Sequence, residues 1–117
     1  MELLNKTESE IIEIVTPIAK SMAEAWSNDD YKSFTAYFEN DKKGILTEDD
    51  FKTQRSWVAE ELGSYTINKI ESTHKNPSNV VITWKVSFAN RSELGLGIYR
   101  FKEINNEIVV SSCIYFH

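Results

Sequence analysis

Four residues with chemically active side chains are spaced along the chain so that an antiparallel sheet would bring them into one row. They are Glu71, Trp84, Tyr99 and Ser112, and Glu71 joins the row if the loop after the first strand closes with four residues. A carboxylate beside Trp and Tyr rings would be desolvated, which raises its pKa and suits it to act as a general base. The alternative is that a bulge turns Glu71 to solvent and leaves Ile70 facing inward, because buried glutamate is rare unless it is paired.

The strands that would position this row are three runs near the C-terminus, Val80–Ala89, Leu94–Ile104 and Ile108–Phe116. In the first run, large apolar residues alternate with smaller or polar ones, and this period of two predicts a strand with one buried face. Short polar breaks at 90–93 and 105–106 suit tight hairpins. The sequence therefore predicts an antiparallel meander at this end of the chain.

The lengths of the two hairpins decide which residues share a face. Loops of two or four residues pair Trp84 with Tyr99 and Phe101 with Val110, and directly paired residues lie on the same side of a sheet. A slip of one residue at either hairpin would destroy the agreement between the two pairings. We therefore expect one face to form the core, made of Val80, Ile82, Trp84, Val86, Phe88, Tyr99, Phe101, Ile108, Val110, Ile114 and Phe116.

Two glycines, Gly95 and Gly97, fall on the same face and would leave a hollow in it. A helix side chain, Trp26 or Trp57, would fill this hollow if the interior is close-packed, as protein interiors normally are. The other interpretation is a cavity for a small apolar ligand. In that case the residues expected to contact the ligand are Trp57, Trp84, Gly97, Tyr99 and Ser112.

The opposite face of the predicted sheet carries more apolar residues than a face exposed only to water would. A patch of this kind usually marks an interface, and we predict homodimerisation through it, with contacts from Leu96, Ile98, Arg100, Val109, Cys113 and Tyr115. The alternative is that a terminal segment of the same chain covers the patch. Arg100 would either bind an anion at the dimer seam or act as a rim charge whose stem covers apolar surface.

The N-terminal half has the three- and four-residue spacing of amphipathic helices. Thr7 opens a capping box for a first helix, in which Pro17 should produce a kink. Asp30 should cap a short aromatic helix, and Thr47 opens a third helix with another capping box. Gly63 is placed to end that third helix in a left-handed conformation.

Two connecting regions complete the predicted order. Asn40–Gly44 is expected to form a turn, and Tyr65–Thr73 a first strand whose weak alternation would be explained by an edge position with a bulge. Helices followed by strands predict an α+β fold in one domain over residues 1–117, with the N-terminal helices packed on a curved four-stranded meander.

Composition excludes several function classes. The net charge of −5, without a cluster of Lys or Arg, argues against nucleic acid or an anionic membrane as a partner. The single cysteine, Cys113, allows no internal disulfide, and no run is long and apolar enough to span a bilayer. No spacing typical of a metal or cofactor site occurs. The chain reads as cytoplasmic, with the trimmed part of an exported protein as the alternative.

Three stretches have a more specific character: Ala25–Phe34, Leu46–Tyr65 and Asn105–Val110. Together they resemble the nuclear transport factor 2-like superfamily, the cystatin-like α+β roll, and are most similar to its small bacterial members of unknown function. The resemblance implies a cone-shaped roll with a cavity between helices and sheet, and dimerisation through the sheet. The superfamily includes isomerases, dehydratases, polyketide cyclases and non-catalytic binders, so fold does not choose among these functions.

The chain departs from the enzymes that it resembles. Dehydratase-like members use a His–Asp pair, but His74 lies at a hairpin end and His117 is the last residue, so no catalytic residue is carried over. The first hypothesis is therefore a non-enzymatic homodimer that binds a small apolar ligand or a protein partner. The second is an isomerase- or lyase-type enzyme with Glu71 as base and Tyr99 as donor. The third is a domain that serves only for multimerisation.

Overall fold

The computed structural model describes residues 2–39 and 46–117. The predicted turn at Asn40–Gly44 lies outside the described residues. The elements, in chain order, are η1 (Leu3–Asn5), α1 (Glu8–Ser27), α2 (Tyr31–Phe34), α3 (Glu48–Leu62), β1 (Tyr65–Lys75), β2 (Val80–Phe88), β3 (Gly95–Ile104) and β4 (Glu107–Phe116).

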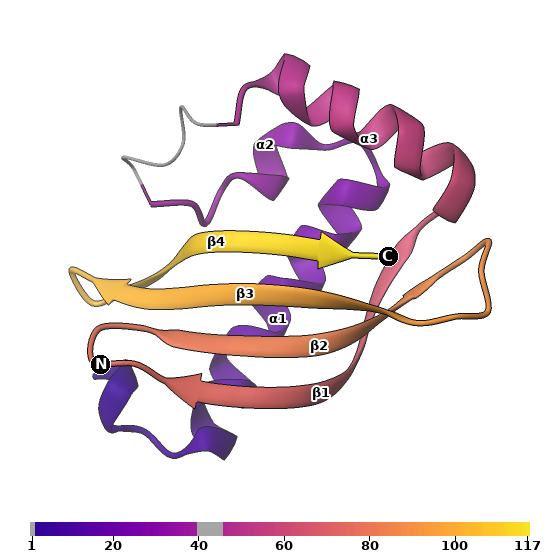
Figure 1. Ribbon diagram of the computed structural model, residues 1–117. Coiled ribbons are helices and arrows are strands. Elements are labelled where there is room, and N and C mark those ends of the chain that lie inside the picture. The colour runs from indigo at the N-terminus through magenta and orange to yellow at the C-terminus, as the bar shows by residue number, and fades with distance from the viewer. Residues whose placement is uncertain (1, 40–45) are drawn as a thin grey trace.

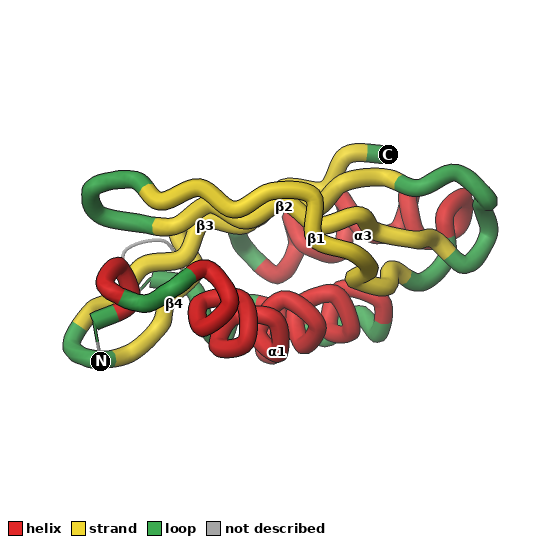
Figure 2. The backbone as a smooth tube through the Cα atoms, turned by 90° about the horizontal axis from the view of Figure 1, so that it is seen from below, coloured by secondary structure: helices red, strands yellow, loops and turns green. Residues whose placement is uncertain are grey.

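The strands form one antiparallel sheet in the order β1-β2-β3-β4, which confirms the predicted meander and the α+β class. Helix α1 packs along one face of the sheet, and α3 lies beyond the β4 edge (Figure 1). The view from below shows α1 against one side of the sheet, and no described helix covers the other side (Figure 2). The sheet therefore has a covered inner face and an open outer face.

The helix ends are formed as their sequences predict. Thr7 and Thr47 each open a capping box, in which their side chains accept hydrogen bonds from the main chain three residues on. Asp30 caps α2, and Gly63 follows α3 with a φ of 75°, a conformation that costs glycine little. Helix α1 runs unbroken past Pro17.

The inner face holds the core, and Trp84 and Tyr99 both lie on it with their ring centroids 5.4 Å apart. The expected pairing of Trp84 with Tyr99 is wrong by two residues, since Tyr99 pairs with Ile82 and Trp84 with Gly97. The β2–β3 connection is longer than a tight hairpin, since Val86 and Gly95 are the last pair before it, and within it Asn90 N donates to the Leu62 carbonyl at 2.9 Å. A shift of two residues leaves every side chain on its predicted face.

The β3–β4 pairing starts as predicted, with Phe101 opposite Val110, but a bulge after Val110 shifts the rest of β4 by one residue. Tyr99 then pairs with Cys113 and Gly97 with Tyr115, so these two β4 side chains face inward. Cys113 and Tyr115 were expected on the outer face, and Ser112, Ile114 and Phe116 on the core face. Those five predictions are wrong, because one extra residue in a strand reverses the faces that follow it.

Strand β1 is irregular on both sides of Ile70, which pairs with Trp84 and faces inward. Glu71 instead forms an ion pair with Lys85 of the outer face, with 3.1 Å between the carboxylate oxygen and Nζ. The predicted row of Glu71, Trp84, Tyr99 and Ser112 is therefore not formed. The alternative given above, a bulge that leaves Ile70 inward, is what the structure contains.

Candidate ligand pocket

A cavity of about 540 Å³ lies between α2, α3 and the β4 edge of the sheet. We call it the β4 pocket, because six consecutive residues of β4 line it. Its lining is Trp26, Phe34, Phe38, Leu46, Gln54, Val58, Tyr65, Val110, Ser111, Ser112, Cys113, Ile114, Tyr115 and His117. The volume falls within the range of roughly 300–1,000 Å³ that is typical of small-molecule sites.

One wall of the β4 pocket is a cluster of aromatic rings around Trp26, the last apolar residue of α1. Its ring centroid lies 5.5 Å from Phe34 and 6.0 Å from both Tyr65 and Tyr115. These separations are within the range in which aromatic pairs attract beyond simple burial. The cluster joins α1, α2, β1 and β4, and so holds the wall in place.

The inner end of the pocket is polar but neutral. The hydroxyls of Tyr99 and Tyr115 share a hydrogen bond, and Tyr99 Oη also lies 3.4 Å from the Ala19 carbonyl. Burial raises the pKa of both tyrosines well above the usual value and raises the pKa of the neighbouring Cys113 thiol to about 12. All three groups therefore stay protonated near neutral pH, and they can offer hydrogen bonds but not negative charge.

Ser111, the residue after Val110 at the bulge, also lines the pocket. Its hydroxyl oxygen is buried and has no hydrogen-bond partner within the described part of the chain. Buried polar atoms are normally paired, so an unpaired one needs an explanation. A rotation of the Ser111 side chain toward the cavity would bring this buried hydroxyl within reach of a ligand.

The residues that line the pocket within ranges 2–39 and 46–117 include no Asp, Glu, Lys or Arg. The polar side chains besides those at the inner end are Gln54, Tyr65, Ser111, Ser112 and His117. In the same ranges, no three His, Cys, Asp or Glu side chains gather so that they could hold a metal ion. The pocket thus offers apolar surface with a few hydrogen-bonding groups.

The five residues predicted to contact a ligand are distributed unevenly around this pocket. Ser112 lines it, and Tyr99 reaches it through the hydrogen bond with Tyr115. Trp84 is buried in the core beside Tyr99. Trp57 is 61% exposed and its ring lies near that of the lining residue His117, but Trp57 does not itself line the pocket.

The predicted glycine hollow is filled by neighbouring side chains. A Cβ at Gly97 would lie 3.3 Å from the Tyr115 ring and 3.1 Å from Val86, and one at Gly95 would lie 2.6 Å from the Phe88 ring. The cavity is therefore displaced from the glycines to the β4 edge, and neither Trp26 nor Trp57 is among the nearest neighbours of the glycines. The sequence analysis did not predict Cys113 and Tyr115 as inner residues, because the alternation of apolar and polar residues in β4 gives no sign of the bulge.

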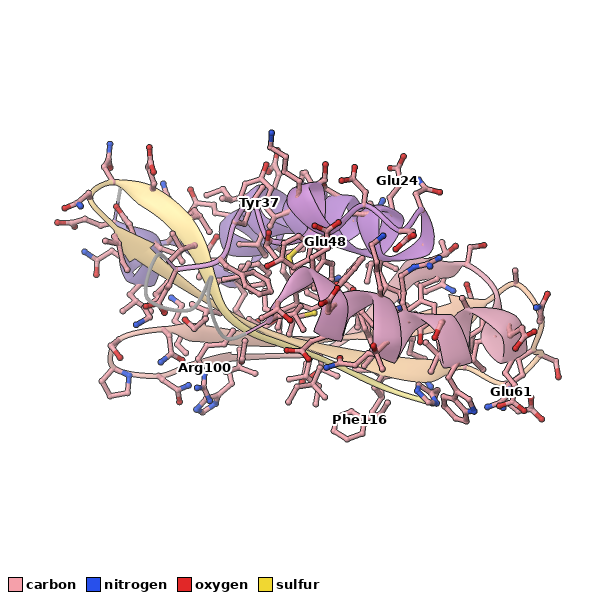
Figure 3. The ribbon with its side chains drawn as sticks, turned by 90° about the horizontal axis from the view of Figure 1, so that it is seen from above. Glu24, Tyr37, Glu48, Glu61, Arg100 and Phe116 are labelled. Atoms are coloured by element: carbon pink, nitrogen blue, oxygen red, sulfur yellow. The ribbon has the colours of Figure 1, made fainter. Side chains whose placement is uncertain are left out.

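The outer face carries a compact apolar group formed by two directly paired couples, Leu96 with Phe116 and Ile98 with Ile114. We call these four residues the outer patch. Ile114 and Phe116 are each 51% exposed, and Figure 3 shows Phe116 and Arg100 extending from the side of the sheet away from α1. Of the predicted interface residues, Leu96, Ile98, Arg100 and Val109 are on this face, but Cys113 and Tyr115 are not.

The described residues contain no helix that is long and apolar enough to cross a membrane. No protein-family model matches the chain, and no curated protein sequence matches it. Solved structures do match. The designed NTF2 protein Rd1NTF2_05 is similar with a TM-score of 0.60 at 10% identity, over 88% of this chain and 96% of that chain.

Two natural proteins show the same likeness. An NTF-2-like protein of unknown function from Shewanella oneidensis MR-1 has a TM-score of 0.54 at 10% identity, over 88% of this chain and 96% of its own. Bd1075 of Bdellovibrio bacteriovorus has a TM-score of 0.56 at 8% identity, over 94% of this chain but only 44% of its own. Identities this low establish the architecture and not the function. This chain has the nuclear transport factor 2-like α+β fold.

Proposed function

We propose that this protein is a non-enzymatic binding protein that takes a small, uncharged and largely apolar ligand into the β4 pocket and works as a homodimer. The observation that carries the proposal is a cavity of about 540 Å³ whose lining in the described ranges is mostly apolar, rich in aromatic rings and without Asp, Glu, Lys or Arg. Apolar pockets with a few convergent polar groups are the usual form of a ligand site. The ligand class follows from this lining.

Among the described lining residues there is no Asp, Glu, Lys or Arg, which favours a neutral ligand, since a buried charge without a partner is costly. The Trp26, Phe34 and Tyr65 rings offer flat apolar contact, which suits planar or branched hydrocarbon groups. The Tyr115 hydroxyl, and the Ser111 hydroxyl after a rotation of its side chain toward the cavity, can bond one acceptor or donor on the ligand. These features support selection by shape with one polar anchor.

A binding role is favoured over catalysis by the state of the candidate reactive groups. Glu71, the predicted base, is on the outer face in an ion pair with Lys85. The raised pKa of Tyr99, Tyr115 and Cys113 makes them poor bases and nucleophiles near neutral pH, because the ionised form is the reactive one. The pocket supports recognition more than proton transfer.

The outer patch supports the homodimer in this proposal. Its four apolar side chains are contiguous and two of them are half exposed, and exposed apolar groups of this kind mark association surfaces. A two-fold axis through the patch would bring it against its own copy, so one surface serves both partners. Arg100 beside the patch would lie at the rim of such an interface. We place the dimer in the cytoplasm, a setting that the single cysteine suits.

The pocket is tested by a substitution that narrows it without disturbing the core. Gln54 is exposed on α3 and lines the cavity, so Gln54→Trp should place an indole at its mouth. Thr53→Trp, one residue earlier on the exposed side, is the matched control. A panel of neutral aromatic and isoprenoid compounds should raise the Tm of wild type and Thr53→Trp but not of Gln54→Trp. Equal shifts in all three proteins would place binding elsewhere.

The dimer is tested by sedimentation velocity at micromolar concentration. Wild type should sediment as a dimer, and Phe116→Asp should sediment as a monomer because two carboxylates would face each other across the axis. Ile104→Asp, at an exposed apolar residue near the β3–β4 turn, is the control and should stay dimeric. A monomeric wild type would contradict the dimer and leave the pocket unaffected.

A further inference from the structure

The β4 pocket is lined by an unbroken run of β4, from Val110 to Tyr115. Side chains of a strand alternate between faces, and Ser112 and Ile114 pair with Arg100 and Ile98 of the outer face. Their presence in the lining therefore means that the pocket meets the edge of the strand and not only its inner face. A ligand bound in this pocket can therefore reach the main chain of β4.

An edge strand in an antiparallel sheet bonds its neighbour with half of its main-chain groups, and the other half point away from the sheet. At Val110 the outward main-chain groups form hydrogen bonds with the segment that follows α2, residues 37–39. Val110 N donates to the Tyr37 carbonyl at 2.7 Å, and Glu39 N donates to the Val110 carbonyl at 3.2 Å. Phe38 thus forms a parallel bridge with Val110, which shows that this edge accepts an added strand.

The added segment is anchored at Glu39. Glu39 is buried, and its carboxylate lies 2.9 Å from Lys102 Nζ of β3. Beyond Val110, within the described residues, no other bridge to the outward groups of β4 occurs. The β4 pocket begins at this point and follows the edge toward the C-terminus.

The two edge strands of the sheet, β1 and β4, differ in the features that prevent pairing with a further strand. Strand β1, the other edge, is bulged on both sides of Ile70 and carries the exposed Lys69 there. Bulges and edge lysines are the usual devices that prevent a further strand from pairing. The part of β4 from Ser112 to Phe116 has neither lysine nor proline, so it lacks the residues that usually prevent a further strand from pairing.

We propose that the ligand of the β4 pocket is an extended, uncharged peptide segment that pairs with the β4 edge beyond Val110, in line with the Tyr37–Glu39 segment. Its main chain hydrogen-bonds β4, and every second side chain enters the aromatic wall around Trp26. The edge from Ser112 to Phe116 has room for roughly four or five residues at about 3.3 Å each. This inference rests on the proposed function, and it names the class of ligand.

The probe is a positional-scanning library of acetylated, amidated hexapeptides made from uncharged residues, screened for binding to the wild-type protein and, separately, to Gln54→Trp. The inference expects peptides with apolar residues at alternate positions to be enriched on wild type and on Thr53→Trp, but not on Gln54→Trp. The best peptide is then N-methylated at each residue in turn. Methylation at alternate residues should weaken binding by about tenfold or more, because each removes a main-chain hydrogen bond, and the residues between should tolerate it.

Two results would overturn the inference. One is a library with no sequence enriched on wild type over Gln54→Trp, and the other is a peptide that tolerates N-methylation at every residue. If neutral small molecules still stabilise wild type and not Gln54→Trp, the pocket function stands and only the peptide is wrong. If neither class binds, both proposals fall. Nuclear Overhauser contacts between peptide amides and β4 Hα protons would confirm the pairing directly.

Discussion

Replacing Ser111 with alanine should stabilise the ligand-free protein, which is the reverse of what most substitutions in a folded chain do. The Ser111 hydroxyl is buried without a partner among the described residues, and burial of an unpaired hydroxyl costs about 1–3 kcal/mol. Removal of one oxygen atom next to an existing cavity adds only about 0.3 kcal/mol of void cost. The expected net gain is about 1–2 kcal/mol in the free energy of unfolding.

Urea unfolding followed by tryptophan fluorescence measures this gain as a higher midpoint with an unchanged slope, and the corresponding rise in Tm is about 4–8 °C. Ser112→Ala is the matched control, because Ser112 pairs with Arg100 on the outer face and its loss should change stability by less than about 0.5 kcal/mol. A Ser111→Ala protein that is less stable than wild type would refute the reasoning. It would mean that the hydroxyl is already satisfied in the free protein and is not held open for a ligand.

Two further predictions concern the frame and the inner end of the pocket. Arg55 of α3 is only 16% exposed in its side chain and donates hydrogen bonds to the Trp26 and Ser27 carbonyls at the end of α1. Arg55→Met should lower the free energy of unfolding by about 2–3 kcal/mol because two charge-assisted bonds are lost. Lys52→Met on the same helix, whose ion pairs are exposed, should cost less than about 0.5 kcal/mol in the same urea titration. The Cys113 thiol has its pKa raised from about 9 to about 12 by burial, so the unfolded chain loses this proton first as pH rises. The free energy of unfolding should therefore fall between pH 9 and 12, with this group contributing up to about 1.4 kcal/mol per pH unit. Cys113→Ala should show a shallower fall in the same pH range. Equal slopes for the two proteins would contradict the buried position of the thiol.

The features that the sequence predicts correctly are those decided by neighbours along the chain. Capping at Thr7 and Thr47 depends on residues three positions away, and the strand alternation around Trp84 depends on residues two positions away. The faces of β2 and β3 survive an error of two residues in their pairing, because an even shift preserves the alternation. Local chemistry was sufficient for the architecture.

The pocket could not be located in the same way, because its position depends on long-range choices. No glycine or proline at Ser111 indicates the bulge. The spacing of Ile108, Val110 and Ile114 is that of a regular strand. The cavity also needs α3 placed beyond the β4 edge, an arrangement that comes from packing rather than from the spacing of residues. A prediction made from alternation alone places the pocket over the glycines instead.

The bulge also explains why the pocket and the outer patch occur together. With regular pairing, Ile114 and Phe116 would face the helices, and Cys113 and Tyr115 would face solvent. One additional residue exchanges the two sets, so the hydroxyl of Tyr115 meets Tyr99 inside while the Phe116 ring emerges opposite Leu96 outside. The exchange leaves two large apolar side chains half exposed and a serine hydroxyl without a partner among the described residues, which a fold selected for stability alone would avoid. Both costs disappear if a second copy covers the outer patch and a ligand pairs Ser111, so the same inserted residue is the physical basis of both parts of the proposed function.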